Sequence, residues 1–183
     1  MSTVTDRPTT VVPAQRVASP SAPKPSVVVA PPRSFVTTAV ERLADVLTAH
    51  SITILRVALG TVFLVFAAFK YVPGASPAED LAIATIHKLT LGLVGGETAL
   101  LVTAITETVI GLTLVTGRFL KVGLCVLAGA LVGIMSPLVL FPGQMWGTDG
   151  PTLTGQYVFK DIVLVAGGLV VAATALGARL RRD

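Results

Sequence analysis

The sequence predicts an all-α integral membrane protein: a four-helix bundle preceded by a disordered N-terminal tail and a short interfacial helix. Four long apolar runs carry this prediction, because each is about long enough to cross a hydrocarbon core of ~30 Å as a helix. The composition agrees, since 52% of the residues are apolar and only 13% are charged, unlike an average soluble domain. The mean hydropathy is +0.80. The runs cover residues 51–69, 98–116, 119–141 and 157–176.

The basic residues give the bundle an orientation. If all four runs cross a membrane, ten of the fourteen Lys and Arg residues fall on one side. Basic loops stay in the cytoplasm, so we expect a bacterial cytoplasmic membrane with both termini inside. The dispersed positions of these residues indicate topology and not a nucleic-acid partner. The ten are Arg7, Arg16, Lys24, Arg33, Arg42, Arg118, Lys121, Arg179, Arg181 and Arg182.

The segments outside the runs differ in composition. Residues 1–33 hold seven of the twelve prolines, which is typical of a disordered tail that cannot bury enough surface to fold. Residues 34–50 carry apolar side chains at helical spacing, so we expect an amphipathic helix on the inner membrane surface. The transmembrane domain is expected over 51–177, and 178–183 form a basic cytoplasmic C-terminus.

Turns, glycines and a proline divide the transmembrane domain further. Ser76 and Pro77 precede two acidic residues, a pattern that predicts the start of a short interfacial or re-entrant helix between the first two spans. Gly129 and Gly133 form a GxxxG pattern, which predicts close helix packing in the third span, and Gly60 has the same role in the first. Pro137 is expected to kink the third span after Ser136.

Two charged residues lie well inside the apolar runs, away from their ends, where charge is costly and usually paired or functional. Arg56 lies in the first run and Glu107 near the middle of the second, so an intramembrane Arg56–Glu107 pair is expected. Two interpretations of it stay open. The pair either carries chemistry or only orients the bundle, with Arg56 reaching back to the inner headgroups as a further structural possibility.

A second group of charges is expected to meet at the outer ends of the spans. Lys70 ends the first span, Glu97 begins the second, and Tyr157, Lys160 and Asp161 begin the fourth. Such a cluster either binds a polar headgroup or forms a ring of interfacial ion pairs. Any pocket should therefore open to the outer face.

Other classes of site find little support in the sequence. It contains no nucleotide-phosphate loop, HExxH motif, nucleophile elbow or repeat, and whether it is an enzyme stays open. A single cysteine, Cys125, excludes an intramolecular disulfide or a paired-cysteine metal site, and no metal site is expected. His50 and His87 fall on opposite sides of the predicted membrane, which disfavours axial haem ligation.

Three segments resemble the DoxX-like superfamily of small four-helix membrane proteins, with its YkgB-like branch closest. They are LRVALGTVFLVFAAFKYVPG at 55–74, TETVIGLTLVTGRF at 106–119 and GQYVFKDIVLVAGGLV at 155–170. The shared positions are Arg56, Lys70, Glu107, Gly111, Gly155, Tyr157, Lys160 and Asp161. The resemblance covers about residues 51–177 and implies quinone-coupled oxidation of sulfur compounds or membrane complexes that handle oxidative stress. Because the chain lacks paired cysteines, it does not extend to independent thiol redox chemistry.

Three hypotheses about function follow. The first is an accessory subunit of a membrane redox or oxidative-stress-response assembly, contacting other redox subunits and a quinone at the outer charged cluster. The second is a small transporter or channel with Arg56 and Glu107 on its path, although few other span positions are polar. The third is a structural scaffold that recruits partners through residues 1–33.

Overall fold

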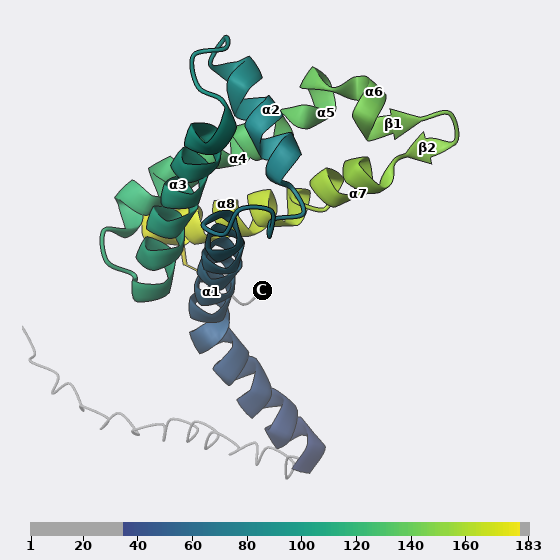
Figure 1. Cartoon of the computed structure of the whole chain (residues 1–183). Coiled ribbons are helices and arrows are strands. Elements are labelled where there is room, and N and C mark those ends of the chain that lie inside the picture. The colour runs from purple at the N-terminus through teal and green to yellow at the C-terminus, as the bar shows by residue number, and fades with distance from the viewer. Residues whose placement is uncertain (1–34, 180–183) are drawn as a thin grey trace, which may run out of the picture. The chain divides into compact units, whose positions relative to one another are not determined.

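The computed structural model describes residues 35–179, which are mostly helical (Figure 1). The tail expected over residues 1–33 lies outside the described residues, as do Ser34 and residues 180–183. The long helices are α1 (Phe35–Lys70), α2 (Glu79–Leu89), α3 (Gly96–Thr116), α4 (Leu120–Met135) and α8 (Ile162–Ala175). The short elements are α5 (Pro137–Leu140), α6 (Pro142–Met145), β1 (Trp146–Gly147), β2 (Gly150–Pro151) and α7 (Leu153–Phe159).

The all-α prediction is confirmed for this part of the chain. Four helical segments are long and apolar enough to cross a membrane, and each overlaps one of the runs recognised in the sequence. These segments are Phe35–Lys70, Gly96–Thr116, Leu120–Leu140 and Leu153–Ala175. The third is interrupted where it was expected to be, since α4 ends at Met135 and α5 begins at Pro137. Proline has no N–H with which to continue the helical hydrogen bonds.

The expected interfacial helix at residues 34–50 is not a separate element. It forms the first part of α1, which continues for 36 residues without a break. No Pro or Gly occurs between Phe35 and Leu59 to interrupt it. At 1.5 Å per residue the helix is about 54 Å long, which exceeds the thickness of a hydrocarbon core of ~30 Å.

The core lies where α1, α3, α4 and α8 meet. Helix α1 contacts α3 and α8, and α4 contacts the same two helices. Gly60 in α1 faces Gly111 in α3 so closely that a Cβ atom added to Gly111 would lie 2.8 Å from the Gly60 carbonyl oxygen. The packing role expected for Gly60 is therefore confirmed. The buried core side chains are Leu59, Phe63, Ile110, Leu114, Leu127, Leu131 and Val171.

The close packing predicted from the GxxxG pattern in the third span is not found within the described residues. A Cβ atom added to Gly129 or Gly133 would meet no heavy atom within 4 Å, so neither glycine forms a close helix contact with a described residue. Both instead line a cavity. The spacing identified a helix face without side chains but could not show what lies opposite that face.

Candidate binding cavity

A cavity of about 440 Å³ lies inside the helical domain. Helices α1, α2, α3, α4, α5, α7 and α8 contribute to its wall, which consists mainly of aliphatic and aromatic side chains. Phe63, Thr85, Pro137 and Val158 are among its buried lining residues. A space of this size and character is typical of a small-molecule site.

Helix α2 forms one wall of the cavity and is held at both ends. At its start, the Gly74 N–H donates to Glu79 Oε2 over 2.9 Å. Near its end, Lys88 Nζ donates to the Leu140 carbonyl over 2.8 Å and lies 4.8 Å from the centre of the Phe141 ring. The short helix expected after Pro77 is confirmed, and its side chains Leu81 and Ile86 line the cavity.

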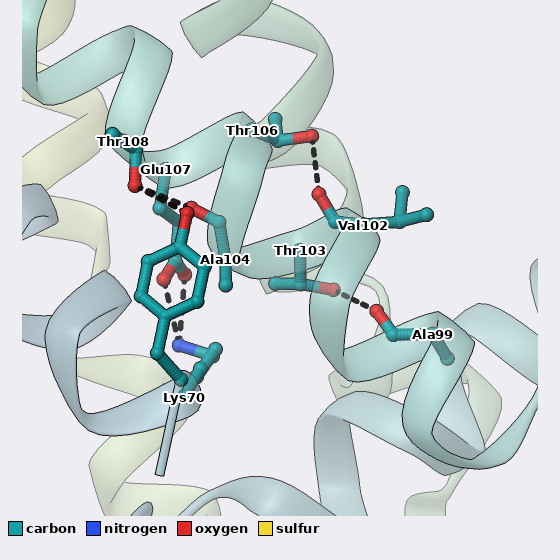
Figure 2. A network of polar contacts seen from close by, with 9 residues as sticks. Lys70, Ala99, Val102, Thr103, Ala104, Thr106, Glu107 and Thr108 are labelled. Atoms are coloured by element: carbon teal, nitrogen blue, oxygen red, sulfur yellow. Dashed lines mark hydrogen bonds and ion pairs between the residues drawn. The ribbon is translucent and has the colours of Figure 1, made fainter.

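The main polar feature of the cavity is a buried ion pair. Lys70 Nζ donates to both carboxylate oxygens of Glu107, at 3.0 Å for Oε1 and 2.8 Å for Oε2, and Figure 2 shows the amine facing the carboxylate. The two side chains are only 5% and 8% exposed, respectively. Both line the cavity, so the pair places opposite charges at the edge of a mainly apolar space.

The expected Arg56–Glu107 pair is wrong. Arg56 Nη1 donates to the Leu114 carbonyl over 2.6 Å, seven residues beyond Glu107 along α3. This carbonyl belongs to the last turn of α3, which ends at Gly117 with a φ of 71°. Arg56 thus satisfies a carbonyl at a helix C-terminus, where a positive charge also interacts favourably with the helix dipole.

Side-chain direction explains why Glu107 pairs with Lys70. Helical side chains lean toward the N-terminus of their own helix. Arg56 and Lys70 therefore both lean back along α1, whereas Glu107 leans in the opposite direction because α3 is antiparallel to α1. Lys70 and Glu107 converge, and Arg56 points away from Glu107 toward the end of α3.

The structure brings together part of the expected outer cluster. Lys70, Tyr157 and Asp161 all line the cavity. Glu97 is exposed in the first turn of α3 and does not line the cavity. Lys160 is also exposed outside the lining, with Nζ 4.7 Å from the centre of the Tyr157 ring. Glu107, which sequence analysis assigned to another pair, takes the place expected for Glu97.

Local backbone features set the position of Tyr157. The Thr152 side chain caps α7 by accepting a hydrogen bond from the Gly155 N–H over 3.0 Å. Gly155 packs directly against the Met145 carbonyl, where a Cβ atom would collide with the oxygen. The resulting placement puts the Tyr157 ring edge-on to Phe66, with centroids 6.3 Å apart.

Threonines add weak polar character to the cavity wall. The hydroxyls of Thr85, Thr103 and Thr106 donate to helix carbonyls four residues earlier, over 2.6, 2.8 and 2.8 Å respectively (Figure 2 shows the last two). They thus satisfy themselves along the helix, as threonine commonly does. Because each hydroxyl hydrogen is already used, these threonines can only accept a hydrogen bond from a ligand. Lys70 is therefore a stronger donor on the cavity wall than the threonines.

No protein-family model, curated protein or solved structure matches this chain. Among residues 35–179, no group of three or more His, Cys, Asp or Glu side chains is placed to hold a metal ion. The cavity, its ion pair and the sequence motifs are therefore the features from which function can be inferred.

Proposed function

We propose that this protein is a multi-pass protein of the bacterial cytoplasmic membrane that binds a quinone and serves a membrane redox or oxidative-stress-response assembly as an accessory subunit. The observation that carries this proposal is the apolar cavity with the buried Lys70–Glu107 pair on its wall. The positive-inside pattern of the sequence supports cytoplasmic termini. In that orientation the cavity lies in the outer half of the bundle.

The cavity has the properties that a quinone ring requires. A quinone is a flat, uncharged ring with two carbonyl oxygens, so it needs an apolar slot and a small number of hydrogen-bond donors. The cavity volume of about 440 Å³ falls within the usual range of small-molecule sites, about 300–1,000 Å³. Phe66 and Tyr157 provide aromatic surface along this slot.

Lys70 is the natural donor to a quinone carbonyl. Its ammonium has three N–H groups, and within residues 35–179 two of them are used on Glu107. Because Lys70 also lines the cavity, its third N–H is the donor that we assign to the ligand. Asp161 adds a carboxylate to the same wall, which favours an uncharged ligand over an anionic one.

The resemblance to the DoxX-like superfamily supports the same conclusion. Four of the positions that carry it, Lys70, Glu107, Tyr157 and Asp161, come from three of the four long apolar segments and line one cavity. Quinone-coupled oxidation is among the activities that the resemblance implies. A shared motif and a shared cavity thus point to one site.

The transport hypothesis has less support from the geometry. It required Arg56 and Glu107 on a common path, but Arg56 binds the Leu114 carbonyl and Glu107 binds Lys70. The scaffold hypothesis depends on residues 1–33, which lie outside the described residues. A role for that tail is compatible with quinone binding and is tested separately by deleting it.

Quinone binding can be tested directly in lipid nanodiscs. We expect decylubiquinone to raise the unfolding temperature of the wild-type protein, because a ligand about 100-fold above its Kd stabilises the folded state by about 2.7 kcal/mol. Lys70→Met should abolish most of the shift. Lys121→Met is the matched control, since Lys121 is exposed at the start of α4 and does not line the cavity.

Two results would overturn the proposal. One is the absence of any shift in the wild-type protein, and the other is an equal shift in wild type and Lys70→Met. If Lys70→Met does not fold, the double variant Lys70→Met/Glu107→Gln replaces it, because it removes both buried charges together. Co-purification of a redox subunit from native membranes would test the accessory-subunit role.

A further inference from the structure

The exposed part of the cavity wall is confined to three helices. Of the lining residues, only Leu89, Val102, Gly129 and Val132 are exposed. They belong to the end of α2, to α3 and to α4, whereas every lining residue of α1, α7 and α8 is buried or half-buried. The exposed lining residues thus gather where these three helices meet, and all four are apolar.

The packing of α3 against α4 explains where the opening lies. The two helices touch closely at one end, where Gly123 packs against the Thr113 side chain. Val102 lies eleven residues from Thr113 and Val132 nine residues from Gly123, which is about 16 Å and about 14 Å along antiparallel helices. The two exposed valines thus lie at similar distances from this tight contact.

Two glycines of α4 keep this opening wide because they have no side chains. Gly129 and Gly133 both line the cavity, and nothing lies within 4 Å of where their Cβ atoms would be. Any larger side chain at these positions would project into empty space at the mouth. The charged residues lie deeper, since Lys70 and Glu107 are both buried.

We infer that the ligand enters the cavity sideways from the lipid bilayer, through a portal between α3 and α4 framed by Leu89, Val102, Gly129 and Val132. The ligand is then a quinone with a long apolar tail, whose ring reaches Lys70 and whose tail leaves through the portal. This inference rests on the proposed quinone binding and adds the route of access and the class of quinone. An opening lined only by apolar groups offers no favourable path to a water-soluble substrate.

The portal is tested by narrowing it and comparing quinones with and without a tail. Val132→Trp places a large ring at the mouth, and Val122→Trp is its matched control, because Val122 is an exposed valine on the same helix that does not line the cavity. We expect Val132→Trp to weaken binding of decylubiquinone by at least about tenfold, or 1.4 kcal/mol. Binding of tail-less duroquinone and all binding by Val122→Trp should stay within about twofold.

A second measurement tests the portal without any quinone. Trp146 is the single tryptophan, so Trp146→Phe combined with Phe63→Trp leaves one fluorophore, on a buried residue of the cavity wall. Phospholipids with brominated acyl chains should quench its fluorescence if lipid chains enter the cavity. Gly129→Leu should reduce that quenching by at least about half, since its side chain fills the mouth.

The two measurements separate failure of the portal from failure of quinone binding. One outcome would keep the portal and refute the proposed ligand. In that case brominated lipids would quench the Trp146→Phe/Phe63→Trp protein, Gly129→Leu would suppress the quenching, and no quinone would bind. The opposite outcome would refute the portal and keep the ligand. In that case Val132→Trp and Val122→Trp would affect quinone binding equally, and the fluorescence of the Trp146→Phe/Phe63→Trp protein would not be quenched. Equal weakening of both quinones by Val132→Trp would also contradict the assignment of the tail to the portal.

Discussion

Removal of Lys70 alone should destabilise the protein far more than removal of Lys70 and Glu107 together. The two charges are 2.8–3.0 Å apart and almost completely buried. At an effective dielectric constant of about 20, unit charges at this separation attract each other by about 6 kcal/mol. Desolvation of each ion costs several kcal/mol and offsets most of that attraction. The net contribution of the intact pair is therefore small.

The single and double variants separate these two terms. Lys70→Met leaves the Glu107 carboxylate buried without its partner, and we expect a loss of about 3–5 kcal/mol. Lys70→Met/Glu107→Leu removes both charges and should lie within about 2 kcal/mol of the wild-type protein, because well-packed apolar pairs often replace buried ion pairs without loss. The measurement is the free energy of unfolding in detergent micelles, followed by circular dichroism, for wild type, both single variants and the double variant.

The coupling energy from this double-mutant cycle shows whether the two buried charges interact directly. A value of at least about 2 kcal/mol would agree with a direct buried pair. Additive single effects would refute the reasoning, because they would mean that Lys70 and Glu107 do not sense each other. Glu107→Gln offers a check on the chemistry, since its amide oxygen can still accept a hydrogen bond from Lys70.

Three further predictions follow from individual contacts. Arg56→Met should lower the free energy of unfolding by about 1–2 kcal/mol, because the bond to the Leu114 carbonyl is lost. In the same unfolding assay its effect should add to that of Glu107→Gln within about 0.5 kcal/mol. A coupling energy above about 1 kcal/mol would instead support an Arg56–Glu107 pair. Gly111→Ala should destabilise by about 1–3 kcal/mol because its methyl group meets the Gly60 carbonyl, whereas Gly129→Ala should be neutral or stabilising by up to about 1 kcal/mol; equal thermal shifts in the two would contradict the packing described. Gly155→Ala should lower the unfolding temperature and weaken decylubiquinone binding by displacing α7, and unchanged binding would mean that Tyr157 does not depend on this contact.

The sequence was sufficient for the helices because their signal is local. Span length, apolar composition and the proline at position 137 each act within one segment, and all were interpreted correctly. The extent of α1 was not, because the charges Glu41, Arg42 and Asp45 mark a change of surroundings and not a break in the helix. The charged composition of this segment does not interrupt the helix, because no proline removes a backbone hydrogen bond there.

The site was harder to predict because it depends on direction and depth. The sequence predicts Lys70 and Glu107 as site residues but in different groups, because the position of a residue along a span indicates its depth and not the lean of its side chain. The same rule, applied to an antiparallel pair, would have joined Lys70 to Glu107 and sent Arg56 toward the end of α3. Gly129 and Gly133 carried no comparable signal, since a glycine pair that packs and a glycine pair that opens a cavity have the same spacing.

The proposed portal to the bilayer would change what determines the affinity for a quinone. When the site is empty of quinone, lipid chains can fill the apolar space, and a quinone tail that replaces them exchanges one hydrocarbon for another at little net gain. Selectivity must then come from the ring and its contact with Lys70, the donor facing the cavity. Once a tail is long enough to pass Gly129 and Val132, lengthening it further should hardly change the affinity measured in nanodiscs. Lys70→Met, in contrast, should weaken every quinone by a similar factor, whatever its tail.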